Sequence, residues 1–559
     1  MADRAQPLNL AVWAGGLAAG VILALTLGTI TAVLTRAEGA FALAAGDLAA
    51  IRFTVTQAVL SAVLSCALAV PVARALARRR FVGRAVLVTL MGAPFILPVI
   101  VAVLGLVMVF GRAGWVSTAL GTLGLPPMNI YGLHGVVLAH VFFNLPLATR
   151  LILQGWLAIP AERFRLAATL DMAPRDIARQ LEWPMLRATL PGAFMVIFLI
   201  CTTSFAVALA LGGGPRATTV ELAIYQAFRF DFDLSRAAFL ALIQLAISAV
   251  AALLALWVAV PQATGGGLDR TVERWDAARL GLRVLDGASI MLAGLFLLLP
   301  LLAIALRGLP EIATLPAGVW AAAWRSVWVA GLSVLVTLAL ALSMTLAITR
   351  LGAAQWGFAT PTPPASICPK KKPEREGFPT WPVAIRRRRA VARGIEAVGY
   401  LAMAASPLVI GTGLFLIVFP FADPVTLALP VTALVNGVMA LPFALRALVP
   451  AAQEVEARFG PLADSLGLTG WHRLRRLTLP RLRRPLGFAA ALAGALSMGD
   501  LGVIALFADP EAGTLPLLLY RLMGSYRMDQ AAGVALVLLA LSLAVFWVLD
   551  RGGRVDADH

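Results

Sequence analysis

Lysine is almost absent from this 559-residue chain, in which 46 residues are Lys or Arg but only Lys370, Lys371 and Lys372 are lysines. A nucleotide-binding Walker A loop needs a Gly-Lys pair followed by Ser or Thr. Each lysine here follows either Pro369 or another lysine. The chain therefore lacks such a loop and cannot be a P-loop ATPase by itself.

Cysteine and histidine are also scarce, with three and four residues. Their positions show no metal-ligand spacing and no disulfide framework, so we expect no metal site and no cofactor. No clustered nucleophile or acid–base pair indicates an enzyme. His134 and His140 are six residues apart and would point about 240° from each other on a helix, so both are interpreted as packing residues. Cys66 and Cys201 are interpreted as buried apolar residues.

Charged residues make up only 13% of the chain and apolar residues 60%, whereas soluble domains have about 25% charged residues. The bilayer must therefore act as the solvent for most of the chain. Apolar runs of about 20 residues predict an all-α membrane protein with about 12 transmembrane helices. The expected spans lie near 11–33, 54–77, 85–110, 132–155, 188–211, 236–260, 287–306, 325–349, 396–419, 425–449, 487–507 and 531–549.

The net charge of +17 follows from the expected topology. With the N-terminus in the cytoplasm, 36 of the 46 cationic residues fall on the cytoplasmic side, as the positive-inside rule requires. The first apolar run lacks a clear cleavage site and is interpreted as a retained span. We therefore expect a multi-pass inner-membrane protein with both termini in the cytoplasm, in contact with the lipid bilayer and not with nucleic acid.

The second half of the chain repeats the first, and each half would hold six spans. The stretch ending at Arg350 resembles the one ending at Arg78. Residues at an offset of 296 also match: Pro146, Arg150, Asp171 and Pro184 correspond to Pro442, Arg446, Gly467 and Pro480. The predicted units are 1–262 and 263–559, related by an axis along the membrane normal.

One segment of the second half, 351–391, has no counterpart in the first. It is rich in proline and contains all three lysines and the run Arg386 to Arg389. This composition predicts a disordered cytoplasmic insertion. A regulatory or anionic-lipid-binding tract is the alternative.

Each half carries the same cytoplasmic motif, predicted at 158–187 and at 450–486. Both segments are typical of a short helix, a turn and a second short helix. The turn needs a backbone conformation that Gly467 adopts freely and that Asp171 tolerates better than most residues. The small side chains of Ala167, Ala168 and Ala463 would let another protein approach the backbone closely.

This motif resembles the cytoplasmic loop of the membrane subunits of bacterial ABC importers. That loop has the pattern Glu-Ala-Ala, three residues, Gly, and a Pro 13 residues further on, and both halves here keep the 13-residue spacing. Leu166 and Leu462 stand where Glu is usual, Asp464 replaces the second Ala, and Asp171 replaces Gly in the first half. An interfacial helix pair that only supports packing is the alternative interpretation.

The resemblance implies two tandem six-helix permease units of a type I ABC importer, without catalytic residues of their own. ATP would be hydrolysed by two copies of a separate ABC ATPase, and a periplasmic substrate-binding protein would deliver the small-molecule substrate. The implied ATPase-coupling residues are Ala167, Ala168, Asp171, Pro184, Ala463, Asp464, Gly467 and Pro480.

Fused double permeases of this kind occur among thiamine and iron(III) importers. Two stretches predicted on the outer side, Thr218–Asp233 and Ser497–Tyr520, resemble the permeases of thiamine importers. The resemblance implies import of thiamine and thiamine phosphates. An iron(III) importer permease and an ion-coupled secondary transporter remain the alternatives, although the latter usually needs several ionisable groups within the membrane.

Asp500 is the only acidic residue within a predicted span, and Ser204 is its repeat counterpart. An intramembrane carboxylate is a functional candidate. Ser204 and Asp500 are therefore the candidate substrate-path residues. Alternatively, Asp500 caps a helix break near Gly499 and Gly502.

Overall fold

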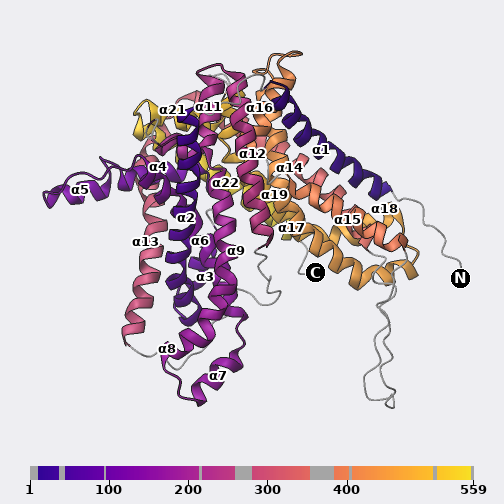
Figure 1. The fold of residues 1–559 in the computed structure, drawn as a ribbon, viewed down its shortest axis with the longest axis horizontal. Helices are drawn as coiled ribbons and strands as arrows, with labels where there is room; N and C mark the ends of the chain where they lie inside the picture. The colour runs from indigo at the N-terminus through magenta and orange to yellow at the C-terminus, as the bar shows by residue number, and fades with distance from the viewer. Residues whose placement is uncertain are drawn as a thin grey trace.

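The computed structural model describes residues 10–554 except 37–43, 93–95, 213, 215–216, 258–279, 353–382, 402–405 and 508–512. These described residues form helices and connecting turns without any strand. Eleven helical segments among them are long and apolar enough to cross a membrane. The prediction of an all-α membrane protein is confirmed (Figure 1).

The first part of the chain contains α1 (Leu10–Arg36), α2 (Ala45–Arg78), α3 (Arg84–Leu90), α4 (Val99–Phe110), α5 (Trp115–Thr122), α6 (Leu133–Ala158), α7 (Ala161–Thr169), α8 (Pro174–Ile177), the π-helical turn η2 (Ala178–Glu182), α9 (Trp183–Thr202), α10 (Phe205–Leu211), α11 (Val220–Arg229) and α12 (Leu234–Trp257). The second part contains α13 (Leu280–Glu311), the short helix η5 (Ile312–Thr314), α14 (Ala317–Gly352), α15 (Val383–Leu401), α16 (Pro407–Val418), α17 (Ala428–Ser465), α18 (Gly470–Arg473), the π-helical turn η7 (Leu474–Thr478), α19 (Leu479–Met498), α20 (Gly502–Phe507), α21 (Leu515–Gly524) and α22 (Met528–Arg554).

The third predicted span of each half is not one continuous helix. The run 85–110 divides into α3 and α4, and the run 396–419 divides into α15 and α16. Pro98 caps the start of α4, and Pro407 is the first residue of α16. Proline disfavours a helical conformation in the residue before it and suits the first turn of a helix. The expectation of a single helix in these two runs is therefore wrong.

The structure revises the predicted insertion at 351–391. Residues 351 and 352 complete α14, and Val383 already begins α15, so the prediction of disorder is wrong at both ends of the segment. Ala392 and Ile395 of α15 are buried in the cluster that α14 and α17 also form, and this apolar face stabilises the helix. The remainder, 353–382, lies outside the described residues.

Helices at equal sequence offsets have matching boundaries. Both η2 and α9 begin and end 296 residues before η7 and α19, and α14 begins 272 residues after α2. These matches support the internal repeat, although the boundary between 1–262 and 263–559 remains a prediction.

The first long helix of each half packs against the other half. Helix α1 contacts α14 and α16, while α13 contacts α2 and α4. In Figure 1, α1 accordingly lies beside the orange helices of the second half and α13 lies beside α2. Aromatic rings also join the halves. The ring of Phe415 in α16 packs edge-on against that of Phe228 in α11, with 4.6 Å between the ring centroids, and its centroid lies 5.6 Å from that of Phe507 in α20.

Candidate functional site

The first of the two motifs is a short helix followed by a left-handed turn. Helix α7 ends at Thr169, and Asp171 has φ +47°. The backbone N–H of Asp171 donates to the carbonyl of Ala168 at 3.1 Å, and that of Met172 donates to the carbonyl of Ala167 at 3.0 Å. These bonds close the helix end in the manner typical of a left-handed C-cap.

The second motif has the same turn geometry. Gly467 has φ +64°, its N–H donates to the carbonyl of Asp464 at 3.1 Å, and the N–H of Leu468 donates to that of Ala463 at 2.9 Å. The left-handed conformation predicted for Asp171 and Gly467 is thus confirmed. The preceding short helix is not separate here, because α17 runs without interruption from Ala428 to Ser465.

The predicted coupling residues divide by exposure. Ala167 and Ala463 are buried against the rest of the chain, so in this structure their small side chains face inward rather than towards a partner. Asp464 is exposed but forms an ion pair with Arg473. The exposed members of the set are Ala168, Asp171, Pro184, Asp464, Gly467 and Pro480.

Four exposed leucines form a feature that the sequence analysis missed. Leu166 and Leu170 lie on the first motif, and Leu462 and Leu466 lie at the corresponding positions of the second. Their exposed fractions are between 57% and 66%. Because they recur at matching positions of both motifs, these leucines are candidate protein-contact residues. The signal was present in the sequence, where two of these leucines replace the usual Glu.

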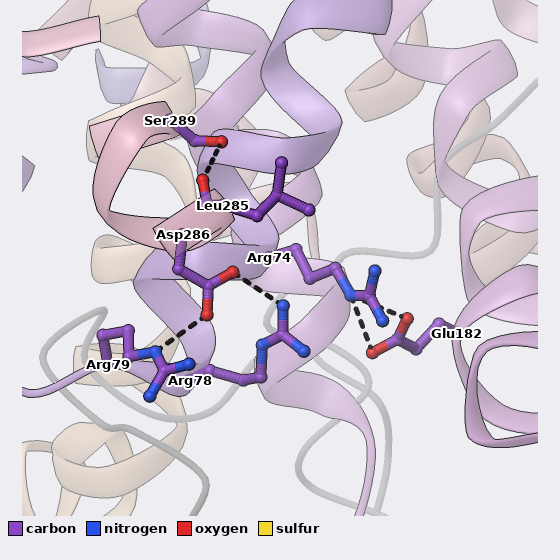
Figure 2. Close-up of polar contacts among 7 residues, drawn as sticks. All are labelled: Arg74, Arg78, Arg79, Glu182, Leu285, Asp286 and Ser289. Atoms are coloured by element: carbon purple, nitrogen blue, oxygen red, sulfur yellow. Dashed lines mark hydrogen bonds and ion pairs between the residues drawn. The ribbon is translucent and has the colours of Figure 1, made fainter. Parts of the chain in front are cut away.

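A set of ion pairs with buried carboxylates ties the first motif to the membrane helices (Figure 2). Glu182 of η2 pairs with Arg74 of α2 at 3.1 Å. At the end of α2, Arg78 and Arg79 pair with Asp286 of α13 at 2.7 and 2.8 Å. The motif is therefore connected through α2 to the first helix of the second half.

The second motif is held by different contacts. Arg473 of α18 is buried, donates to Glu456 of α17 at 2.6 Å and also pairs with Asp464. These contacts fix the turn against the end of α17. In Figure 1, α7 and α8 lie at the bottom of the view and α18 lies at the right.

A polar cluster lies in the membrane-spanning part of the first half. The imidazole of His140 bonds to the hydroxyl of Ser61 at 3.3 Å and to that of Ser204 at 2.7 Å. Asn144 donates to the thiol sulfur of Cys201 at 3.4 Å. The predicted burial of Cys66 and Cys201 is confirmed. His140 is buried as well, but it does more than pack, because α2, α6 and α9 bring its polar atoms and those of Ser61 and Ser204 together.

The second half carries the corresponding cluster. Ser497, the counterpart of Cys201, bonds to Ser333 at 2.9 Å and accepts a hydrogen bond from Asn436 at 3.1 Å. Asn436 is the counterpart of His140, and Asp500 is the counterpart of Ser204. Each half thus has a network of three helices around a break in its fifth span, between α9 and α10 and between α19 and α20.

A cavity of about 200 Å³ lies where the two halves meet. His140, Asn144 and Ser204 line it from the first half, and Leu496 and Gly499 line it from the second. The polar side chains that line the cavity therefore come from the first half, and its apolar side chains come from both halves.

The two candidate path residues are placed differently. Ser204 lines the cavity. Asp500 is not among its lining residues, and one carboxylate oxygen accepts a hydrogen bond from the N–H of Gly502 at 3.2 Å. Asp500 therefore caps the start of α20, as the alternative interpretation expects. No group of three or more His, Cys, Asp or Glu in the described ranges could hold a metal ion.

Comparison with known proteins identifies the class of this membrane protein. Residues 381–551 match the family of binding-protein-dependent transport system inner membrane components. This match includes the second motif and, from the second polar cluster, Asn436 of α17 and Ser497 of α19.

Similarity to individual proteins extends over nearly the whole chain. The thiamine transport system permease protein ThiP of Brucella abortus (strain 2308) is 38% identical over 546 residues, covering 96% of this chain and 94% of that protein. ThiP of Escherichia coli (strain K12) is 39% identical over 522 residues, covering 91% and 90%. ThiP of Salmonella typhimurium (strain LT2) is 38% identical over 561 residues, covering 99% and 98%. The chain belongs to the family of thiamine transport system permeases.

Proposed function

We propose that this chain is the membrane subunit of an ABC importer that carries thiamine and thiamine phosphates into the cytoplasm. The observation that carries the proposal is the full-length similarity to proteins named as thiamine transport permeases. The match to inner membrane components of binding-protein-dependent transport supports a multi-pass inner-membrane location. Both termini are expected in the cytoplasm because of the distribution of Arg and Lys.

In this proposal, the two motifs receive two copies of a separate ATPase. The exposed leucine pairs Leu166/Leu170 and Leu462/Leu466 would be inserted into apolar grooves of the ATPase subunits. The left-handed turns at Asp171 and Gly467 end each docking helix and fix the direction of the following segment. A periplasmic binding protein would deliver substrate to the opposite face.

Movement of the motifs would reach the cavity through direct connections within the chain. In the second half, α17 contains both Ala463 of the motif and Asn436 of the polar cluster. These residues are about 40 Å apart along one helix at 1.5 Å per residue. In the first half, α6 ends before Pro160, and the Arg74–Glu182 ion pair connects the motif to α2 instead. Closure of the ATPases would therefore change the contact between the halves at the cavity.

The experiment that tests coupling uses the full chain with its ATPase and binding protein in proteoliposomes. Leu166→Asp/Leu462→Asp should lose both ATPase binding and ATP-dependent uptake of radiolabelled thiamine, because each change puts a charge on an apolar contact. Leu123→Asp, at an exposed leucine predicted on the opposite side, is the control and should retain both. Normal uptake by the double variant would contradict the proposed docking surface.

The same vesicles distinguish the substrate and the energy source. Thiamine phosphate should compete with labelled thiamine, whereas ferric ion should not. Uptake that needs an ion gradient but no ATP would instead identify a secondary transporter.

A second experiment tests the path through the cavity. Ser204→Val should raise the KM for thiamine, because it removes a hydroxyl that lines the cavity and bonds to His140. If Asp500 also belongs to the path, Asp500→Asn should abolish uptake while assembly with the ATPase is retained. Normal uptake by Asp500→Asn would leave Asp500 with its capping role alone.

A further inference from the structure

The buried ion pair that joins the halves on one side of the molecule lacks its counterpart on the other. The offset of 272 that relates α2 to α14 places Arg350 at the position of Arg78. The same offset places Ala14 of α1 at the position of Asp286 of α13. Arg78 is paired with Asp286 at 2.7 Å, whereas the methyl group of Ala14 can pair with nothing.

A cavity occupies this place. Its volume is about 660 Å³, and both Ala14 and Arg350 line it. Helices α1, α14, α17 and the second motif enclose it, and much of its wall is apolar, including Leu10, Leu342 and Leu346. The missing carboxylate has therefore been replaced by open space rather than by a packed side chain.

The cavity contains hydrogen-bond donors that the described residues do not satisfy. Arg350 forms no hydrogen bond or ion pair with another described residue. The other charged lining groups are Arg473, Glu456 and Asp464. Both carboxylates are committed to Arg473, and the buried Nε of Arg473 still lacks a partner. Arg473 is therefore enclosed by its two carboxylates, and the guanidinium of Arg350 is the group with N–H donors to offer an incoming anion.

The position of Arg350 points to a lipid as the source of that anion. Arg350 lies in the last turn of the membrane-spanning helix α14, and Leu10 is the first described residue of α1. Ends of membrane-spanning helices lie at the level of the lipid headgroups. A guanidinium between helices at this level suits the phosphate of an anionic lipid. Leu342 and Leu346 continue the apolar wall towards the membrane interior.

We propose that the phosphate of an anionic phospholipid binds Arg350 in this cavity and supplies the counter-charge that Asp286 supplies to Arg78. The acyl chains lie along α1 and α14. The lipid thereby completes, on one side of the molecule, a contact between the halves that the protein makes by itself on the other.

Lipid retention by the purified full-length chain tests the proposal. The protein is equilibrated in detergent with equal amounts of phosphatidylglycerol and phosphatidylcholine, and retained lipid is measured by native mass spectrometry. Wild type should retain phosphatidylglycerol preferentially. Ala14→Asp, which supplies the missing carboxylate, and Arg350→Gln, which removes the cation, should each lower that preference about tenfold. Gly16→Asp is the matched control, because a side chain added at Gly16 would meet only open space. This variant should keep the preference for phosphatidylglycerol.

Three outcomes would overturn the proposal. Ala14→Asp could retain phosphatidylglycerol as wild type does, or Gly16→Asp could lose it equally. Inorganic phosphate could also raise the apparent Tm of wild type as much as phosphatidylglycerol does, without raising that of Ala14→Asp. This result would identify free phosphate as the ligand. If Arg350→Gln fails to fold, Ala14→Asp still decides, because it keeps Arg350. Since none of these measurements uses transport, their result is independent of the proposed function.

Discussion

Asp286 offers the sharpest test of how the halves are held together. Its side chain is 3% exposed, and it pairs at 2.7 Å with Arg78, which is 1% exposed. Arg79, which is 18% exposed, pairs with the other carboxylate oxygen at 2.8 Å. Asp286→Ala would leave the Arg78 guanidinium buried without this carboxylate. Removing one partner of a buried pair costs about 3–5 kcal/mol, a large part of the stability of a folded chain.

The assay is thermal unfolding of the full-length chain in one detergent, with Asp231→Ala as the control. Asp231 pairs with Arg236 at 3.6 Å, and both side chains are about half exposed, so its loss should cost at most about 1 kcal/mol. The apparent Tm of Asp286→Ala should therefore fall several times further than that of Asp231→Ala.

A double variant identifies the physical cause of that loss. Arg78→Met/Asp286→Leu replaces the two most buried charges by apolar side chains of similar size, which is often close to neutral in a buried site. Arg79 loses Asp286 in both variants, so the double variant should recover the part of the apparent Tm that Asp286→Ala loses through Arg78. The reasoning would be refuted if Asp286→Ala unfolded at the same temperature as Asp231→Ala. Failure of the double variant to recover would show that shape, and not an unpaired charge, decides the stability.

Two further predictions use the same unfolding assay. Glu221 is fully buried in α11, outside the membrane-spanning helices. Burial raises the pKa of its carboxyl to about 7, and a hydrogen bond from Ser406 lowers this pKa by a smaller amount. The folded state therefore binds the proton more tightly than the unfolded state, and stability falls as pH rises from about 4.5 to 7. At pH 8, Glu221→Gln should be more stable than wild type by at most about 3 kcal/mol. At pH 4 the two proteins should be equally stable. An equal gain in stability at both pH values would contradict this prediction. Gly467→Ala should lower the free energy of unfolding by about 1 kcal/mol, because residue 467 has a left-handed φ. Asp171→Gly should not lower it. Equal losses of stability in these two variants would show that the turn is not strained.

The membrane class and the position of the two motifs were predictable because they depend on local chemistry. Apolar run length is set by the thickness of the bilayer, and most of the predicted spans appear as helices. The turn conformation at Asp171 and Gly467 also follows from residue type. The predictions failed where proline divides a long apolar run, as before Pro98 and Pro407, because hydropathy does not register a helix break.

Membership of a thiamine transport permease family was also within reach of the sequence, because it depends on motif spacing and on similarity along the whole chain. The sequence by itself thus determined that a bilayer surrounds most of this protein and to which family the protein belongs.

Only the tertiary structure decided which distant residues meet. Arg78 and Asp286 are 208 positions apart and form an ion pair because α13 crosses to the other half. His140 and Ser204 line one cavity, and Ala167 and Ala463 are buried while the neighbouring leucines are exposed. No local preference encodes these arrangements, since they arise from the packing of whole helices against one another, and the same packing leaves Arg350 beside an open cavity where its counterpart has a carboxylate.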